Sequence, residues 1–185
     1  MAVTESTMLE LGTTAPDFAL TDAVSGKTVR RDEFRGKKGL LVMFICAHCP
    51  YVKHIEKTLG PFAADYVSQP LGIVAISSND AAAYPTDNPE GLKKQAQANG
   101  FIFPYLYDES QKVARSYKAA CTPDFFLFDK DLKLVYRGQY DSSRPGNNIP
   151  ITGMDLRAAI DLALDGRPVP TEQRPSIGCN IKWKE

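Results

Sequence analysis

The sequence predicts an α/β fold in which helices flank a central mixed β-sheet, with a β-hairpin added on the N-terminal side. Two unbroken apolar runs, residues 40–45 and 71–77, are typical of strands that are buried on both faces. Between them, apolar side chains recur at three and four residues from Val52 to Tyr66, which predicts a helix with one buried face. Strand, helix and strand in this order predict a parallel crossover.

Turn residues and apolar spacing predict the N-terminal elements. Residues 1–10 are expected to form a loose tail, and Gly26 separates two short alternating stretches that predict a hairpin ahead of the main sheet. Pro50 suits the first position of a helix, because its missing N–H has no partner there. Gly60 and Pro61 predict a kink in that helix.

The second half of the chain continues the same alternation of strands and helices. The predicted elements are a polar loop over 78–88, a helix from Pro89 to Asn99, an extended aromatic stretch over 101–107, a helix capped by Asp108, a hairpin of strands 124–128 and 132–136, a polar loop over 138–150, and a last helix capped by Thr152 and ended by Gly166. The proline-broken tail 167–185 carries the chain's one tryptophan, Trp183, so part of it is expected to pack back on the domain.

Length and charge restrict the classes of function. The 185 residues fit a single domain over 1–185, with its core over about 12–165. Lysine plus arginine and aspartate plus glutamate both number 22, so no net charge points to nucleic acid or to an anionic membrane surface. No apolar run approaches membrane-spanning length, and the first seven residues lack the basic and apolar regions of a secretory signal. We therefore expect a cytoplasmic protein with neither nucleic acid nor membrane as partner.

A pair of cysteines at a strand–helix corner is the clearest functional signal. Cys46 and Cys49 lie between the first buried strand and Pro50. A helix N-terminus carries unpaired N–H groups and a partial positive charge, and both favour a thiolate over a thiol. In a reducing compartment such a pair is catalytic or metal-binding. A zinc site needs four ligands, and only Cys121 and Cys179 remain, each without a partner at short spacing.

Three motifs together resemble the peroxiredoxin-like redoxins of the AhpC/TSA type, within the thioredoxin superfamily. They are Ala-Pro-Asp-Phe at 15–18, the corner at 46–50, and Cys-Thr-Pro-Asp-Phe at 121–125. The resemblance spans most of residues 12–165. It implies a thioredoxin-like fold and a thiol–disulfide oxidoreductase that uses the Cys46–Cys49 pair.

The resemblance also implies roles for single residues. Cys46, more exposed at the helix start, would attack a substrate disulfide, and Cys49 would resolve the mixed disulfide. Pro123 would be a cis-proline that keeps the dithiol accessible, and Thr122 would offer its backbone to an extended substrate. His48 would stabilise the Cys46 thiolate and raise the redox potential above that of thioredoxin.

Two other functions stay open. In peroxiredoxins the peroxidatic cysteine falls at the position of Cys49, although the threonine and proline of that motif are Cys46 and Val42 here. Arg115 and Arg137 are candidates for the arginine of a peroxide pocket. A metal-binding redoxin is the second alternative, but copper carriers of this fold add a distant histidine, and the only histidines here are His48 and His54.

The remaining cysteines and polar residues have less specific readings. Cys121 is either a buried core residue or a third group with a redox or ligand role that supports the site. Cys179 is incidental, packed beneath Trp183, or a distal resolving thiol of this subunit or a neighbouring one. His54 is expected on the helix surface. Loop capping accounts for three acidic residues, Asp80, Asp87 and Glu90.

No organic cofactor or resident metal is implied by the resemblance. Electrons would come from a dithiol protein or from glutathione, and the substrates would be protein or low-molecular-weight disulfides and thiols, with peroxide as a further option. A homodimer is left open.

Overall fold

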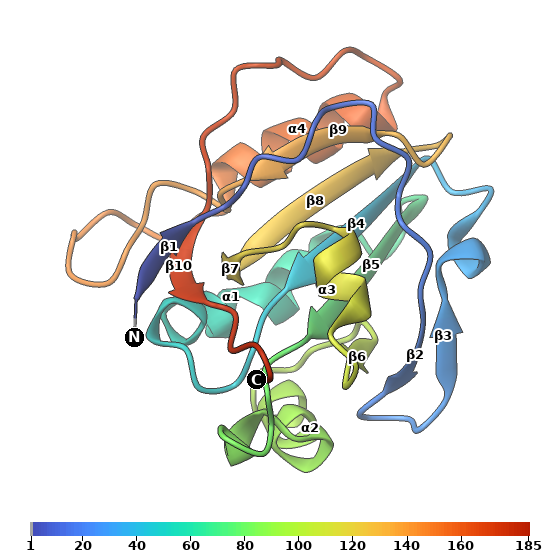
Figure 1. Cartoon of the computed structure of the whole chain (residues 1–185). Coiled ribbons are helices and arrows are strands. Elements are labelled where there is room, and N and C mark those ends of the chain that lie inside the picture. Colours follow the sequence, from blue (N-terminus) through green and yellow to red (C-terminus); the bar gives the residue numbers. More distant parts are fainter. Residues whose placement is uncertain (1) are drawn as a thin grey trace.

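The computed structural model describes residues 2–185, and a seven-stranded mixed sheet forms its centre (Figure 1). In spatial order the strands are β3 (Thr28–Arg30), β2 (Ala19–Asp22), β6 (Tyr105–Tyr107), β5 (Leu71–Ser77), β4 (Gly39–Phe44), β8 (Asp124–Asp129) and β9 (Leu134–Gly138). Strands β4, β5 and β6 are parallel, and the other pairs are antiparallel. The predicted mixed sheet is confirmed.

Helices cover both faces of this sheet. They are α1 (Pro50–Asp65), α2 (Pro89–Ala98), α3 (Lys112–Ser116) and α4 (Met154–Leu164), with short 3₁₀ helices η1 (Arg31–Phe34) and η2 (Pro85–Asp87). Alternate side chains of β4 serve two cores, because successive residues of a strand point to opposite faces. Leu41 and Met43 pack with α1, α2 and α4, whereas Val42 and Phe44 pack with α3 and the N-terminal segment.

The predicted hairpin around Gly26 is present as β2 and β3. It is part of the main sheet, because β2 also pairs with β6. Helix α1 runs continuously through Gly60 and Pro61. A Cβ atom on Gly60 would lie 2.5 Å from the carbonyl oxygen of Asn99, so a glycine lets the chain after α2 pack directly on α1.

A second, three-stranded sheet joins the two ends of the chain. Its order is β1 (Val3–Glu5), β10 (Ile177–Asn180) and β7 (Cys121–Thr122), all antiparallel (Figure 1). The prediction of a loose tail over residues 1–10 is therefore wrong. The sequence could not reveal this pairing, because the partner of β1 lies more than 170 residues further along the chain. The C-terminal tail packs back on the domain, as expected.

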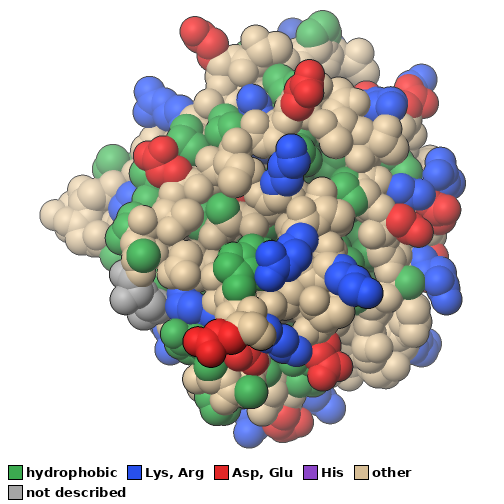
Figure 2. Space-filling model, viewed as in Figure 1, with side chains coloured by type: hydrophobic (Ala, Val, Ile, Leu, Met, Phe, Trp, Pro, Cys, Tyr) green, Lys and Arg blue, Asp and Glu red, His purple; other side chains and the backbone are tan. Residues whose placement is uncertain are grey.

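The surface carries both signs of charge. On the face shown in Figure 2, basic and acidic side chains are interspersed, in keeping with the equal numbers in the sequence. Within residues 2–185, every helix is too short or too polar to cross a membrane.

Candidate active site

Cys46 and Cys49 lie in the loop that joins β4 to α1. Cys49 is the N-cap residue of α1, with Pro50 in the first position, and the N–H of Lys53 donates to the Cys49 carbonyl at 2.9 Å to begin the helix. Both cysteines are fully buried, at 0% exposed surface. The expectation that Cys46 is the more exposed thiol is wrong, because the helix begins only after Cys49 and the chain ends cover the corner.

Thr122 contacts both thiols of the pair. Its Oγ1 lies 3.4 Å from the Sγ of Cys46, and its carbonyl oxygen lies 3.3 Å from the Sγ of Cys49. The peptide bond between Thr122 and Pro123 is cis, as the resemblance implied. The strand β7 thus brings one residue against the entire dithiol corner.

Cys179 completes a cluster of three thiols. Its Sγ lies 2.6 Å from the Sγ of Cys49, and it is 3% exposed. In the pairing of β10 with β7, Cys179 stands opposite Thr122. Trp183 packs against Arg115, at 4.4 Å from the guanidinium carbon to the ring centre, while the contact of the Cys179 thiol is with Cys49.

The backbone of Thr122 already has a partner strand. We expected this backbone to receive an extended substrate, yet the chain's own β10 occupies that position. Accordingly, neither Cys46 nor Cys49 is accessible in this state, contrary to the expectation that Pro123 keeps the dithiol open. One feature of the sequence points to a docked tail: Cys179 and the chain's one tryptophan lie close together in it.

The surroundings of Cys49 favour its thiolate. Hydrogen bonding from the Cys46 thiol, opposed by burial and aided by the Cys179 thiol and the Val52 N–H, lowers the pKa of Cys49 to about 5. The Val52 N–H belongs to the first turn of α1, where the helix dipole also favours a negative charge. Cys49 is therefore the anionic member of the cluster.

The surroundings of Cys46 favour its thiol form. Burial, followed by the hydrogen bond to Cys49 and the nearby Asp87 carboxylate, raises the pKa of Cys46 well above its ordinary value. Burial and the bond to Cys49 likewise raise the pKa of Cys179. The prediction that His48 stabilises a Cys46 thiolate is wrong, because the negative charge is better accommodated at the helix N-terminus, on Cys49.

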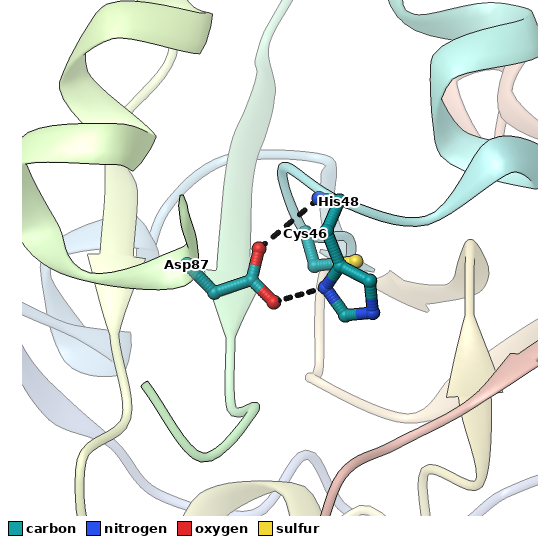
Figure 3. Close-up of side chains that lie close together, drawn as sticks. All are labelled: Cys46, His48 and Asp87. Carbon is teal, nitrogen blue, oxygen red and sulfur yellow. Dashed lines mark hydrogen bonds and ion pairs between the residues drawn. The ribbon is translucent and has the colours of Figure 1, made fainter. Parts of the chain in front are cut away.

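His48 is engaged with Asp87 (Figure 3). Its Nδ1 lies 2.5 Å from one carboxylate oxygen of Asp87, while the other oxygen accepts the N–H of Ala47 at 2.7 Å and that of His48 at 3.2 Å. Burial raises the pKa of Asp87, but the bonds from His48, Asn79 and Ala47 outweigh it and hold the pKa below its ordinary value. Asp87 therefore fixes the loop between the two cysteines.

Asp87 was missed as a site residue. It is 0% exposed, and its carboxylate bonds to Ala47 and His48, whereas loop capping would bind it only within its own loop. A capping aspartate and a buried one look the same in sequence, because the difference lies in a histidine 39 positions away. The other two acidic residues for which loop capping was predicted are Asp80 and Glu90. Asp80 accepts a hydrogen bond from the N–H of Ala82, as a capping residue does, and the Oε1 of Glu90 lies 3.7 Å from the Nζ of Lys94.

Cys46, His48 and Asp87 could also hold a metal ion, since one ligand atom of each lies within 4.8 Å of the others. Both oxygens of Asp87 already accept hydrogen bonds, including one from Asn79 at 2.9 Å. A cation bound through Nδ1 of His48 would have to take the place of its bond to Asp87. The geometry thus favours a structural pairing over metal coordination.

The other candidates lie away from the three thiols or are inert. Cys121 is buried beside Pro123, and burial raises the pKa of its thiol. His54 lies half-buried on α1, where its Nε2 bonds to Ser143 at 2.7 Å. Arg137 donates to the carbonyl of Leu9, and Arg115 is engaged by Trp183, so neither arginine is positioned on Cys49.

A dithiol at a strand–helix corner of a mixed sheet, in contact with the residue before a cis-proline, defines a thioredoxin-like redox protein. The family description AhpC/TSA matches residues 11–137, and the chain belongs to this family. Thiol-disulfide oxidoreductase ResA of Geobacillus thermodenitrificans is 30% identical over 131 residues, which cover 71% of this chain and 70% of ResA. Putative peroxiredoxin Rv2521 of Mycobacterium tuberculosis is 28% identical over 168 residues, which cover 88% of this chain and 100% of Rv2521.

Solved structures share the fold. An uncharacterized conserved protein from Geobacillus kaustophilus superposes with a TM-score of 0.97 at 55% identity, covering 100% of this chain and 97% of that one. A putative thiol:disulfide interchange protein DsbE from Chlorobium tepidum superposes with a TM-score of 0.66 at 22% identity. The match covers 84% of this chain and 99% of that one. The second likeness confirms the thioredoxin-like fold.

Proposed function

We propose that Cys49, rather than Cys46, is the attacking thiolate of this thiol–disulfide oxidoreductase. The observation that carries the proposal is the position of Cys49 at the N-terminus of α1, with donors on several sides. The thiolate is the nucleophile in thiol–disulfide exchange. The names of the ResA relatives support the reaction class.

The reaction runs in two exchanges. The Cys49 thiolate attacks one sulfur of a substrate disulfide, forming a mixed disulfide and releasing the other half as a thiolate. Cys46, losing its proton, then attacks the Sγ of Cys49 and releases the second half of the substrate. The substrate disulfide gains two electrons, and the Cys46–Cys49 pair is oxidised to a disulfide. A dithiol protein or glutathione in a reducing cytoplasm is the reductant that we propose for the return step.

The experiment compares Cys46→Ser with Cys49→Ser. Both are made in a Cys179→Ser chain, where a hydroxyl keeps a donor beside Cys49 and no third thiol can resolve the intermediate. We expect Cys49→Ser to lose disulfide reduction and Cys46→Ser to accumulate a mixed disulfide on Cys49. A mixed disulfide on Cys46 in the Cys49→Ser chain would overturn the assignment.

Peroxide reduction is a second candidate, favoured by one observation: a thiol lies 2.6 Å from the Cys49 sulfur. Attack of the Cys49 thiolate on a peroxide would give a sulfenic acid and release water or an alcohol, and condensation with a neighbouring thiol would release water and form a disulfide. The relative named as a putative peroxiredoxin supports this candidate. Peroxide consumption by Cys49→Ser and by Cys46→Ser, both in the chain that keeps Cys179, tests it: Cys49→Ser should be inactive. A homodimer stays a prediction.

A further inference from the structure

We propose that Cys179 is a third redox-active thiol, which β10 holds against Cys49 and which forms a disulfide with it. The inference rests on the proposed role of Cys49 as the attacking thiolate. It adds an internal exchange partner to the Cys46–Cys49 pair.

The contact between the two sulfur atoms is the first support. Cys179 and Cys49 lie 2.6 Å apart, and both are shielded from solvent. Cys121 provides an internal contrast, because it is equally buried but its Sγ faces the carbonyl oxygen of Pro123 at 3.8 Å. Burial of a cysteine in this protein therefore does not by itself bring it to the site. The strand pairing places Cys179 there.

Gly178 is what lets β10 approach so closely. A Cβ atom on Gly178 would lie 2.0 Å from the carbonyl oxygen of Thr122 and 3.2 Å from the Cδ of Pro123. A backbone oxygen and a proline ring cannot move aside as the end of a flexible side chain can. The glycine before Cys179 is thus required for the docked position of the strand.

Both ends of the tail strand are anchored. On its outer side, Val3 of β1 stands opposite Cys179, and the N–H of Asn180 donates to the carbonyl of Ala2 at 3.1 Å. Beyond the strand, the N–H of Lys182 donates to Asn79 at 2.8 Å. Asn79 donates in turn to Asp87, the carboxylate that fixes the loop between Cys46 and Cys49. The docked tail and the dithiol loop therefore share one hydrogen-bond network.

The exchange balances without any outside reagent. Cys179 loses its proton and attacks the Sγ of Cys49 in the Cys46–Cys49 disulfide. The bond between Cys49 and Cys179 forms as that between Cys49 and Cys46 breaks, and Cys46 leaves as a thiolate that takes up the proton. No electron is gained or lost. In a mixed disulfide on Cys49, the same attack releases the substrate thiol instead.

The consequence is that the tail competes with substrate. β10 lies between β1 and β7 over the start of α1, so a substrate reaches Cys49 only when this strand moves away (Figure 1). A disulfide between Cys49 and Cys179 would fix the tail in the docked position, and reduction would release it.

The test uses the full chain carrying Cys46→Ser, treated with oxidised glutathione and followed by peptide mass mapping. We expect a transient glutathione adduct on Cys49 that gives way to an intramolecular Cys49–Cys179 disulfide. Adding Cys179→Ser should slow the loss of the adduct by more than about a hundredfold, because an intramolecular attack at contact distance is lost. A persistent adduct on Cys49 beside a free Cys179 thiol would overturn the proposal.

Two further variants guard the interpretation. Gly178→Ala, in the Cys46→Ser chain, should displace β10 and slow the internal disulfide although every remaining thiol is kept. Cys121→Ala, in the same chain, removes a buried cysteine of the neighbouring strand and should leave the mapped Cys49–Cys179 disulfide in place. An internal disulfide that forms equally fast with Gly178→Ala would contradict the docked-strand explanation.

Failure of this inference is distinct from failure of the proposed function. If Cys179 is inert but Cys49 attacks, the Cys46→Ser chain traps substrate on Cys49 and stops there. If Cys49 does not attack, no adduct forms on it in either chain.

Discussion

The sulfur atoms of Cys49 and Cys179 lie 2.6 Å apart although 130 positions separate them in the chain. One comes from the N-terminus of α1 and the other from the last strand. The contact joins the dithiol corner to the C-terminal tail, and the pairing of β10 with β7 and β1 is what brings the two thiols together.

The first prediction concerns the ionisation of Cys49. Because its pKa is lowered to about 5 in the folded state, the reduced protein should carry one thiolate from about pH 6 upward. Thiolate ultraviolet absorbance as a function of pH measures this directly, even for a buried group. The step should vanish in Cys49→Ser and persist in Cys121→Ala. A step that vanishes only in Cys46→Ser would place the thiolate on the other cysteine.

The same shift predicts how stability depends on pH. The folded pKa is depressed relative to the unfolded value of about 8.5, so the thiolate's contribution is fully present above the unfolded pKa and is lost as the pH falls toward about 5. As the pH is lowered through this window, the free energy of unfolding of the reduced protein should therefore fall relative to that of Cys49→Ser. Urea unfolding of both proteins at several pH values checks the sign, and a difference that does not change with pH would contradict it.

The redox potential should lie above the value of about −270 mV known for thioredoxin. A stabilised Cys49 thiolate favours the reduced form of the pair, and this makes the disulfide the stronger oxidant. Equilibration of the Cys179→Ser chain with glutathione isolates the Cys46–Cys49 couple. A potential at or below that of thioredoxin would refute the argument.

Thr122→Val removes the hydroxyl beside Cys46 and keeps the backbone contact with Cys49. Loss of this bond should disfavour the Cys46 thiolate further and slow resolution of the mixed disulfide by about tenfold, whereas Thr122→Ser should retain the rate. Single-turnover kinetics in the Cys179→Ser chain measures the step. The absorbance titration of Cys49 should not move in either variant, which separates this role from a general loss of packing.

Asp87→Asn should destabilise the fold by about 3 kcal/mol, since it places an amide group against the donors of His48 and Asn79 in a buried site. Denaturant unfolding measures the loss. Asp80→Asn, in the same loop, is the matched control. Asp80 accepts only a local bond from Ala82, so the change should stay within about 0.5 kcal/mol. Equal effects of the two substitutions would show that Asp87 has no special role.

The order of strands and helices could be predicted because it depends on local patterns. The apolar run that forms β4 is short and follows turn residues, which favours a buried strand, and the stripe from Val52 to Tyr66 has the period of an amphipathic helix. Cys46 and Cys49 were found for the same reason, since their spacing and the following Pro50 are adjacent in the chain. The facing Thr122–Pro123 was expected only from family resemblance.

What the sequence determined by itself is the sheet, its helices and the dithiol corner. The tertiary structure alone decided which thiol is charged, because that depends on where α1 begins and on donors that surround Cys49. It also decided the pairing of β1 and β10, the burial of Asp87 beneath His48, and the arrival of Cys179 at the site. Each of these joins segments far apart in the chain, and no local pattern of residues carries the information about such a contact.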